Sequence, residues 1–318
     1  MGEDATSGRQ GRDVGRPGRF DAGAWRRILW RVWDGLGRDH LSIMSAGVAF
    51  FGVLAIFPAI AALIALYGLV ADPSEVAQSL QSAKPLLPPD VFAMIEDQVG
   101  QIVAAGQSKL GIASLVSLVL ALWSARAGVT ALMEGLNVVY NETDTRSLVA
   151  QYLASLMLTL LLIVVAIGAL LAVVAVPALL HFSDFGWVGT VLAQVTPLLI
   201  LGVAVVFVIG GLYRYGPHRA LARKRWVSVG ALVATVGWVL VSLALSVYVS
   251  RFADFNQTYG SLGAIVGLLF WLYASAFVVL IGAEINAQME LQTERDTTTG
   301  PARPMGERGA FVADHVAD

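Results

Sequence analysis

The chain has 318 residues, of which 57% are hydrophobic and only 14% are charged, and its mean hydropathy is +0.70. A soluble domain of this length could not bury so much apolar surface, so the composition excludes an ordinary soluble protein and indicates a bilayer as solvent. Cysteine is absent, which excludes disulfides and thiolate metal sites, and the net charge of −2 has meaning only once the charges are placed along the chain.

The N-terminal region begins with a Gly- and Arg-rich stretch, and we expect residues 1–24 to form a disordered cytoplasmic tail. The stretch 25–33 (WRRILWRVW) then places Ile28, Leu29 and Val32 on one helical face. Its arginines, Arg31 among them, are available for lipid phosphates. This pattern predicts an interfacial helix along the inner leaflet.

Six apolar segments follow, each long enough to cross about 30 Å of hydrocarbon as a helix. They predict an all-α polytopic membrane domain over residues 25–290, a bundle of six transmembrane helices, and beyond it a disordered cytoplasmic tail over residues 291–318. Pro58 and Pro197 lie inside spans and predict helix kinks. The predicted spans are 41–69, 110–133, 148–178, 188–213, 226–249 and 258–286.

The sizeable loop after the first span, residues 72–108, contains a second helical pattern. Val91, Ile95, Val99 and Ile102 recur at helical spacing, so this loop is expected to be an extracytoplasmic amphipathic helical segment. It would serve either as a lid on the bundle or as a substrate-binding cap, and the sequence leaves both readings open.

The distribution of lysine and arginine predicts the orientation of the chain. When the six spans alternate across the membrane, 18 of the 21 lysines and arginines fall on one side, and Lys84, Lys109 and Arg251 fall on the other. Because positive charge accumulates on the cytoplasmic side, both termini are expected in the cytoplasm.

Residues that could carry catalysis are scarce. The four histidines, His40, His181, His218 and His315, are scattered along the chain without a metal-binding spacing. The sequence also contains no phosphate-binding Gly-rich loop and no nucleophile elbow. We therefore expect no catalytic residues, no metal, no cofactor and no enzyme activity.

One polar cluster is the candidate site. Arg126 lies about 24 Å along the second span, and Glu284 lies about 34 Å along the sixth, both counted from the outer face, so the two reach a similar depth. A carboxylate and a guanidinium at the edge of the hydrocarbon stabilise one another when paired, and Asn137 and Asn286 could complete their hydrogen bonds. The cluster would be either a structural clasp or a substrate or proton site.

Four blocks of sequence carry a family resemblance. They are SAGVAFFGVLAIFPAI from Ser45, WSARAGVTALMEGLNVVYN from Trp123, LYRYGP from Leu212, and TYGSLGAIVGLLFWLYASAFVVLIGAEINA from Thr258. In this order, over residues 25–290, they resemble the signatures of the YihY/BrkB family of bacterial inner-membrane proteins. The four residues of the polar cluster lie within these blocks.

The resemblance implies a six-helix protein of the bacterial cytoplasmic (inner) membrane whose biochemical activity is not established. Some members are linked to envelope integrity or to resistance to serum killing, and the family long carried a ribonuclease BN label. That label is disfavoured here, because no acid–base set or metal site is grouped in the sequence.

Two classes of function follow. The first is transport or handling of a lipid or another envelope-related substrate, which needs polar groups facing a cavity between helices. The alternative is a non-transporting structural or partner-binding membrane protein, which needs only small-residue packing faces. The expected partners are membrane lipids and a lipid or small-molecule substrate, with no nucleic acid, and the oligomeric state stays open.

Overall fold

The computed structural model describes residues 12–70, 96, 107–182, 186–252 and 261–317. The chain divides into two compact units. The first comprises Met1–Ala46, Val129–Ser246 and Tyr273–Asp318, and the second comprises Gly47–Gly128 and Val247–Leu272. Each unit is described separately below.

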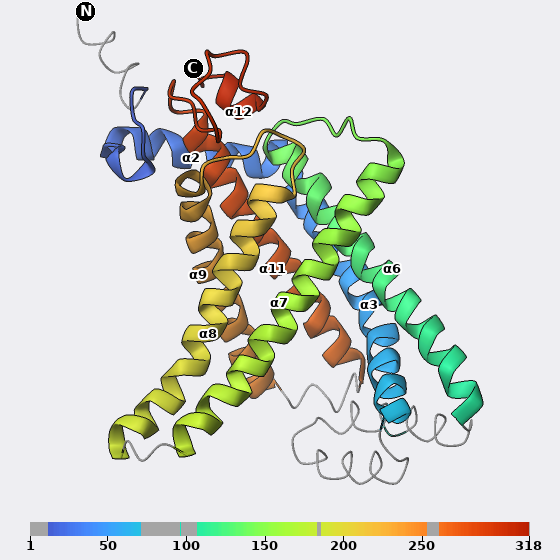
Figure 1. Ribbon diagram of the computed structural model, residues 1–318. Coiled ribbons are helices and arrows are strands. Elements are labelled where there is room, and N and C mark those ends of the chain that lie inside the picture. The colour runs from blue at the N-terminus through green and yellow to red at the C-terminus, as the bar shows by residue number, and fades with distance from the viewer. Residues whose placement is uncertain (1–11, 71–95, 97–106, 183–185, 253–260, 318) are drawn as a thin grey trace, which may run out of the picture. The chain divides into compact units, whose positions relative to one another are not determined.

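The described residues form helices and one isolated antiparallel bridge, between Ala222 and Thr298. The long apolar segments form the long helices, as their uninterrupted hydrophobicity requires in a bilayer. In chain order the elements are η1 (Pro17–Arg19), α2 (Ala22–Arg38), α3 (Leu41–Val70), α6 (Gln107–Val139), α7 (Leu148–Phe182), α8 (Gly186–Tyr215), α9 (Lys224–Phe252), α11 (Ser261–Glu290) and α12 (Phe311–Asp314) (Figure 1).

Five helices in the described part of the chain, α6, α7, α8, α9 and α11, are long and apolar enough to cross a membrane. A sixth is counted when α2 and the Leu41–Ile56 part of α3, which meet at a bend of 62°, are taken as one broken span. The prediction of a polytopic helical membrane protein is thus confirmed. The helices extend a few residues past most predicted span ends, because a helix can continue beyond the hydrocarbon that defines the apolar run.

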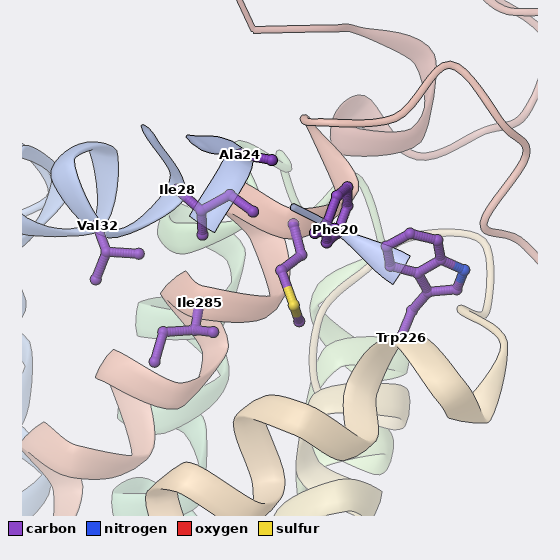
Figure 2. Packing of buried hydrophobic residues seen from close by; sticks show 7 residues of the cluster. Phe20, Ala24, Ile28, Val32, Trp226 and Ile285 are labelled. Atoms are coloured by element: carbon purple, nitrogen blue, oxygen red, sulfur yellow. The ribbon is translucent and has the colours of Figure 1, made fainter. Parts of the chain in front are cut away.

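In the first unit, α2 lies against the start of α9 and the end of α11 (Figure 2). The α2 residues Ala24, Ile28 and Val32 recur at helical spacing and are buried with Trp226 of α9 and with Ile285 and Met289 of α11. The carboxylate of Asp21 caps α2 by accepting a hydrogen bond from the Ala24 N–H at 3.0 Å. A buried face of α2 therefore packs on protein.

The opposite side of α2 retains the character of an interfacial helix. Trp30 and Trp33 are 74% and 72% exposed, as aromatic residues at a membrane surface would be. The expectation that Arg31 is available for lipid phosphates is wrong, however. Its guanidinium donates hydrogen bonds to Gln288 and Gln292 at the end of α11 instead.

The remaining helices of the first unit pack in pairs. α7 packs against α8, and the two helices lie closest in the lower part of the view (Figure 1). α9 and α11 approach closely at Gly230 and Gly282, where a Cβ on Gly282 would lie 2.5 Å from the Gly230 carbonyl oxygen. Small residues at a helix contact allow the backbones this approach.

The second unit contains most of α3, the first part of α6 and the first part of α11. A Cβ on Gly128 of α6 would lie 3.6 Å from the Cβ of Phe51 of α3. Leu272 of α11 would contact a Cβ on Gly52 at 3.1 Å, so α3 packs against both partners through small residues.

Both prolines singled out by the sequence lie inside continuous helices, Pro58 in α3 and Pro197 in α8. Their effect on the helix axis stays a prediction. The extracytoplasmic segment predicted over 72–108 lies outside the described residues except for Glu96 and the start of α6.

The expectation of a disordered tail over 291–318 is wrong for residues 291–317, which are folded. The Ala317 N–H donates to the Leu291 carbonyl, and the Ala220 N–H donates to the Gly309 carbonyl, each at 2.8 Å. Arg308 donates to the carbonyl oxygens of Ala313 and Glu294. Composition alone indicated disorder, but the segment makes these backbone contacts and buries Ala310, Val312 and Ala313.

The N-terminal tail differs in the same way where it is described. Residues 12–24 contain η1 and the start of α2, and they bond to the C-terminal segment. The Glu294 N–H donates to the Arg12 carbonyl at 2.7 Å, and the Thr293 hydroxyl donates to the Val14 carbonyl at 2.8 Å. The two ends of the described chain therefore lie on the same side of the first unit.

Candidate functional site

The last turns of α11 are polar on several faces and yet buried. Glu284, Asn286 and Glu290 are each 0% exposed, and Gln288 is also buried. Buried polar groups need partners, and Asn286, Gln288 and Glu290 bond to different neighbours in the first unit, whereas the Oε2 of Glu284 is buried without a hydrogen-bond partner in the described residues. The result is a polar helix end enclosed by α2, by α9 and by the residues that follow α8.

Glu284 and Gln288 face α2. The Gln288 Nε2 donates to the Glu284 Oε1 at 2.9 Å, and the Arg31 Nε donates to the Gln288 Oε1 at 2.8 Å. The Glu284 carboxylate lies directly against Gly35, where a Cβ would lie 2.9 Å from the carboxyl carbon. Only a residue without a side chain fits at position 35.

Asn286 faces α9. Its Oδ1 accepts a hydrogen bond from the Gly230 N–H at 2.8 Å, and its Nδ2 donates to the Val227 carbonyl at 3.3 Å. Asn137, at the end of α6, accepts a hydrogen bond from the His218 N–H at 2.8 Å. Both amides therefore bond to main-chain groups, and their role as partners of an Arg126–Glu284 pair stays a prediction.

Arg126 belongs to the second unit and Glu284 to the first. Their pairing stays a prediction. Within the first unit, the structure brings together three of the four predicted residues, Asn137, Glu284 and Asn286, at the cytoplasmic ends expected for α6 and α11.

An ion pair that the sequence analysis did not identify lies next to them. The Arg219 guanidinium donates to both carboxylate oxygens of Glu290, at 2.8 and 2.9 Å, and both side chains are almost fully buried. The Thr297 hydroxyl donates to the same carboxylate at 2.6 Å, and the guanidinium lies 4.4 Å from the centre of the Tyr140 ring.

The electrostatics of this pair favour the charged arginine. Burial is the largest influence and lowers the pKa of Arg219, but the charge and hydrogen bonds of Glu290, together with Tyr140 and Glu142, outweigh it and the pKa is raised. A signal for the pair was present in the sequence, because Glu290 follows Asn286 by four residues and Arg219 lies in the basic turn. The spacing could not show that the C-terminal segment would cover both.

The loop between α6 and α7 adds a second ion pair. The Arg146 guanidinium donates to the Asp144 carboxylate at 2.7 Å, and this contact lowers the pKa of Asp144. The His218 Nδ1 lies 3.8 Å from the same carboxylate. Within the described residues, no three histidines, aspartates or glutamates come together in a way that could hold a metal ion.

A groove of about 420 Å³ lies between α7, α8 and α9 in the first unit. Its walls are apolar, with Leu162 of α7, Phe207 of α8 and Ala231 of α9 among them. At one end the lining changes to Arg214, Lys224 and Ser228. The groove therefore has an apolar length and a cationic end.

The two cationic side chains of the groove, Arg214 and Lys224, have no acidic partner among the described residues. Within the described part of the chain, neither Arg214 nor Lys224 forms an ion pair with a carboxylate. The Nε of Arg214 is buried and has no hydrogen-bond partner there, and the guanidinium lies 5.7 Å from the centre of the Tyr215 ring. From the sequence, these two residues were explained by the positive-inside rule. The groove was not predicted, because its walls come from three different helices.

Comparison with known proteins agrees with this architecture. The model of the Virulence factor BrkB family matches residues 32–306. A protein of Bacillus subtilis (strain 168) named as ribonuclease-like is 31% identical over 76% of this chain and 88% of its own length. A UPF0761 membrane protein of Aeromonas salmonicida (strain A449) is 27% identical over 85% of this chain and 90% of its own length.

A UPF0761 membrane protein of Vibrio vulnificus (strain YJ016) is 24% identical over 80% of this chain and 79% of its own. No solved structure matches the chain. The family match covers most of the sequence and agrees with the membrane-length helices. The chain therefore belongs to the Virulence factor BrkB family.

Proposed function

We propose that this protein lies in the bacterial cytoplasmic membrane with both termini in the cytoplasm and transports or handles a lipid. The observation that supports the proposal is the groove between α7, α8 and α9, whose apolar walls end at Arg214 and Lys224. An acyl chain suits the walls, and a polar head group suits the cationic end.

The size of the groove suits a ligand. At about 420 Å³ it lies within the range of roughly 300–1,000 Å³ that is usual for small-molecule sites. Its exposed wall residues, such as Phe207 at 74%, would face acyl chains of the bilayer, so a lipid could enter sideways without crossing water. The buried polar end of α11 serves in this proposal as a structural clasp that fixes α2, α9 and α11.

The proposal includes no enzyme activity and no nucleic-acid partner, although a relative carries a ribonuclease-like name. RNA cleavage usually requires a grouped acid–base set or metal ions. Two of the four histidine rings make other contacts: His315 stacks on Phe311 with the ring centres 4.0 Å apart, and His218 lies beside Asp144.

The proposal can be tested with a substitution whose side chain fills the groove. Gly211 lines it, and a Cβ at this position would meet no atom within 4 Å, so Gly211→Phe adds a ring in the groove without disturbing the helix contacts. Gly202→Phe is the matched control, because Gly202 also lies on α8 with open space around its Cα but does not line the groove.

Purified protein is washed with lipid-free detergent and examined by native mass spectrometry, and it is then reconstituted in vesicles with a fluorescent phospholipid. We expect the wild type and Gly202→Phe to retain a bound phospholipid and to accelerate its exchange between leaflets, and Gly211→Phe to lose both. Retention without exchange would leave lipid binding and refute transport. A wild type that retains no lipid would refute the proposal and favour the structural or partner-binding alternative.

A further inference from the structure

A second cavity, of about 590 Å³, lies beside the groove and is lined by three arginines. Arg16 and Arg19 come from the segment around η1, and Arg225 comes from the first turn of α9. Ser228 and Val229 of α9 complete the wall, so no acidic residue lines this cavity. We call Arg16, Arg19 and Arg225 the arginine cluster.

The arginine cluster forms no ion pair with an acid in the described residues. None of its three guanidinium groups forms an ion pair there, and the buried Nε of Arg225 has no hydrogen-bond partner. Arg16 and Arg223 are near enough to repel Arg225. Several like charges held together without acids are unfavourable, and an anion between them would remove the repulsion.

Two acids line an adjoining cavity, and both already have hydrogen-bond or ion-pair partners. This cavity, of about 360 Å³, shares Arg19 and Arg225 with the first and also contains Asp13 and Asp296. Asp13 pairs with Arg295 at 2.6 Å, and the Asp296 carboxylate accepts hydrogen bonds from Thr298 and from the Arg303 N–H. Neither acid forms an ion pair with a member of the arginine cluster.

The arginine cavity and the groove meet at the start of α9. Ser228 lines both, Arg225 faces the arginine cavity, and Lys224 faces the groove. The N-terminus of α9 adds a partial positive charge at this junction. One ligand with an apolar tail and an anionic head would satisfy both spaces.

We infer that the arginine cluster binds the phosphate-bearing head group of an anionic phospholipid whose acyl chain occupies the groove. The inference rests on the proposed function and adds the class of lipid. Guanidinium groups bind phosphate oxygens in pairs of parallel hydrogen bonds, whereas a zwitterionic head group would bring its own ammonium into a site that is already cationic.

The test measures lipid preference. Wild-type protein in mixed vesicles of phosphatidylglycerol and phosphatidylcholine is extracted, and the lipid retained by it is identified by native mass spectrometry. Arg19→Gln with Arg225→Gln removes two members of the arginine cluster. Arg38→Gln with Arg303→Gln removes the same charge from exposed positions outside the cavity and is the control.

We expect the wild type and the control to retain phosphatidylglycerol preferentially, and the cluster variant to lose about tenfold of that preference while it still retains lipid. Equal retention of both lipids by the wild type, or an unchanged preference in the cluster variant, would overturn the inference and leave the proposed function intact. Displacement of the lipid by millimolar inorganic phosphate alone would show a site for free phosphate and would also overturn it. A wild type that holds no lipid at all would instead refute the proposed function.

Discussion

At the scale of single residues, the first unit contains a buried ion pair between Arg219 and Glu290. Neither side chain has more than 1% of its surface exposed, so water cannot compensate either charge if the other is removed. Breaking such a pair usually costs about 3–5 kcal/mol, whereas replacing both partners with apolar residues is often much less costly. The pair is therefore expected to be a structural element of the side of the first unit that carries both ends of the described chain.

The prediction compares single and double variants. Arg219→Met and Glu290→Met should each lower the thermal unfolding midpoint in detergent, and the double variant should recover most of the loss. Arg303→Met, at an exposed position, should leave the midpoint unchanged. All midpoints are compared at one scan rate, because membrane proteins often unfold irreversibly. A double variant that is less stable than either single variant would contradict this account.

The residues of this side show what sequence could predict and what it could not. Glu284 and Asn286 were identified as candidate site residues because they are polar and lie at the end of a long apolar segment. Their partners were not, because Gly35, Gly230 and Arg31 have no individual signal in the sequence. In the sequence, the members of the arginine cluster counted only as positive charge that sets the orientation. Their cavity could not be predicted, because it forms where the segment around η1 lies next to α9.

At the scale of the helices, the sequence predicted the bounds well because each helix must satisfy its own backbone in the bilayer. The sequence did not predict which helices pack against one another. The contact of α9 with α11 depends on Gly230 and Gly282, and each lies where a methyl group would meet backbone or side-chain atoms of the other helix. This contact holds Asn286 within bonding distance of α9.

Gly282→Ala should therefore disturb the pair. Its Cβ would lie 2.5 Å from the Gly230 carbonyl oxygen and 2.8 Å from the Ala234 Cβ, so the helices must separate. Overpacking of this kind costs about 1–3 kcal/mol, which should appear as a lower thermal unfolding midpoint. Gly202→Ala is the control, since its Cβ meets no atom within 4 Å. Equal midpoints for Gly282→Ala and the wild type would show that α9 and α11 do not approach as described.

At the scale of the whole chain, the folded C-terminal segment changes how topology should be tested. Six spans require both ends on one side, and the bonds that join residues 12–14 to residues 293–294 agree with this. The positive-inside rule assigns that side to the cytoplasm, which stays part of the proposal. Because the chain has no cysteine, single cysteines can report the orientation without background.

The choice of positions follows from burial. Thr297 would seem a convenient tail position, but it is 0% exposed and donates a hydrogen bond to Glu290, so a cysteine there would resist labelling on either side. Glu307 is exposed in the same segment and is the better reporter. Gln78, which lies outside the described residues, reports the segment predicted to be extracytoplasmic.

In intact cells treated with an impermeant maleimide, Gln78→Cys should be labelled and Glu307→Cys should be protected. Glu307→Cys should become reactive once the membrane is permeabilised. Thr297→Cys should stay protected even then, and should react only after denaturation, because the folded segment and not the membrane covers it. Labelling of Glu307→Cys in intact cells would invert the orientation, and the arginine cluster would then face anionic lipids of the outer leaflet. Labelling of Thr297→Cys in permeabilised but folded protein would show that the C-terminal segment does not pack over Glu290.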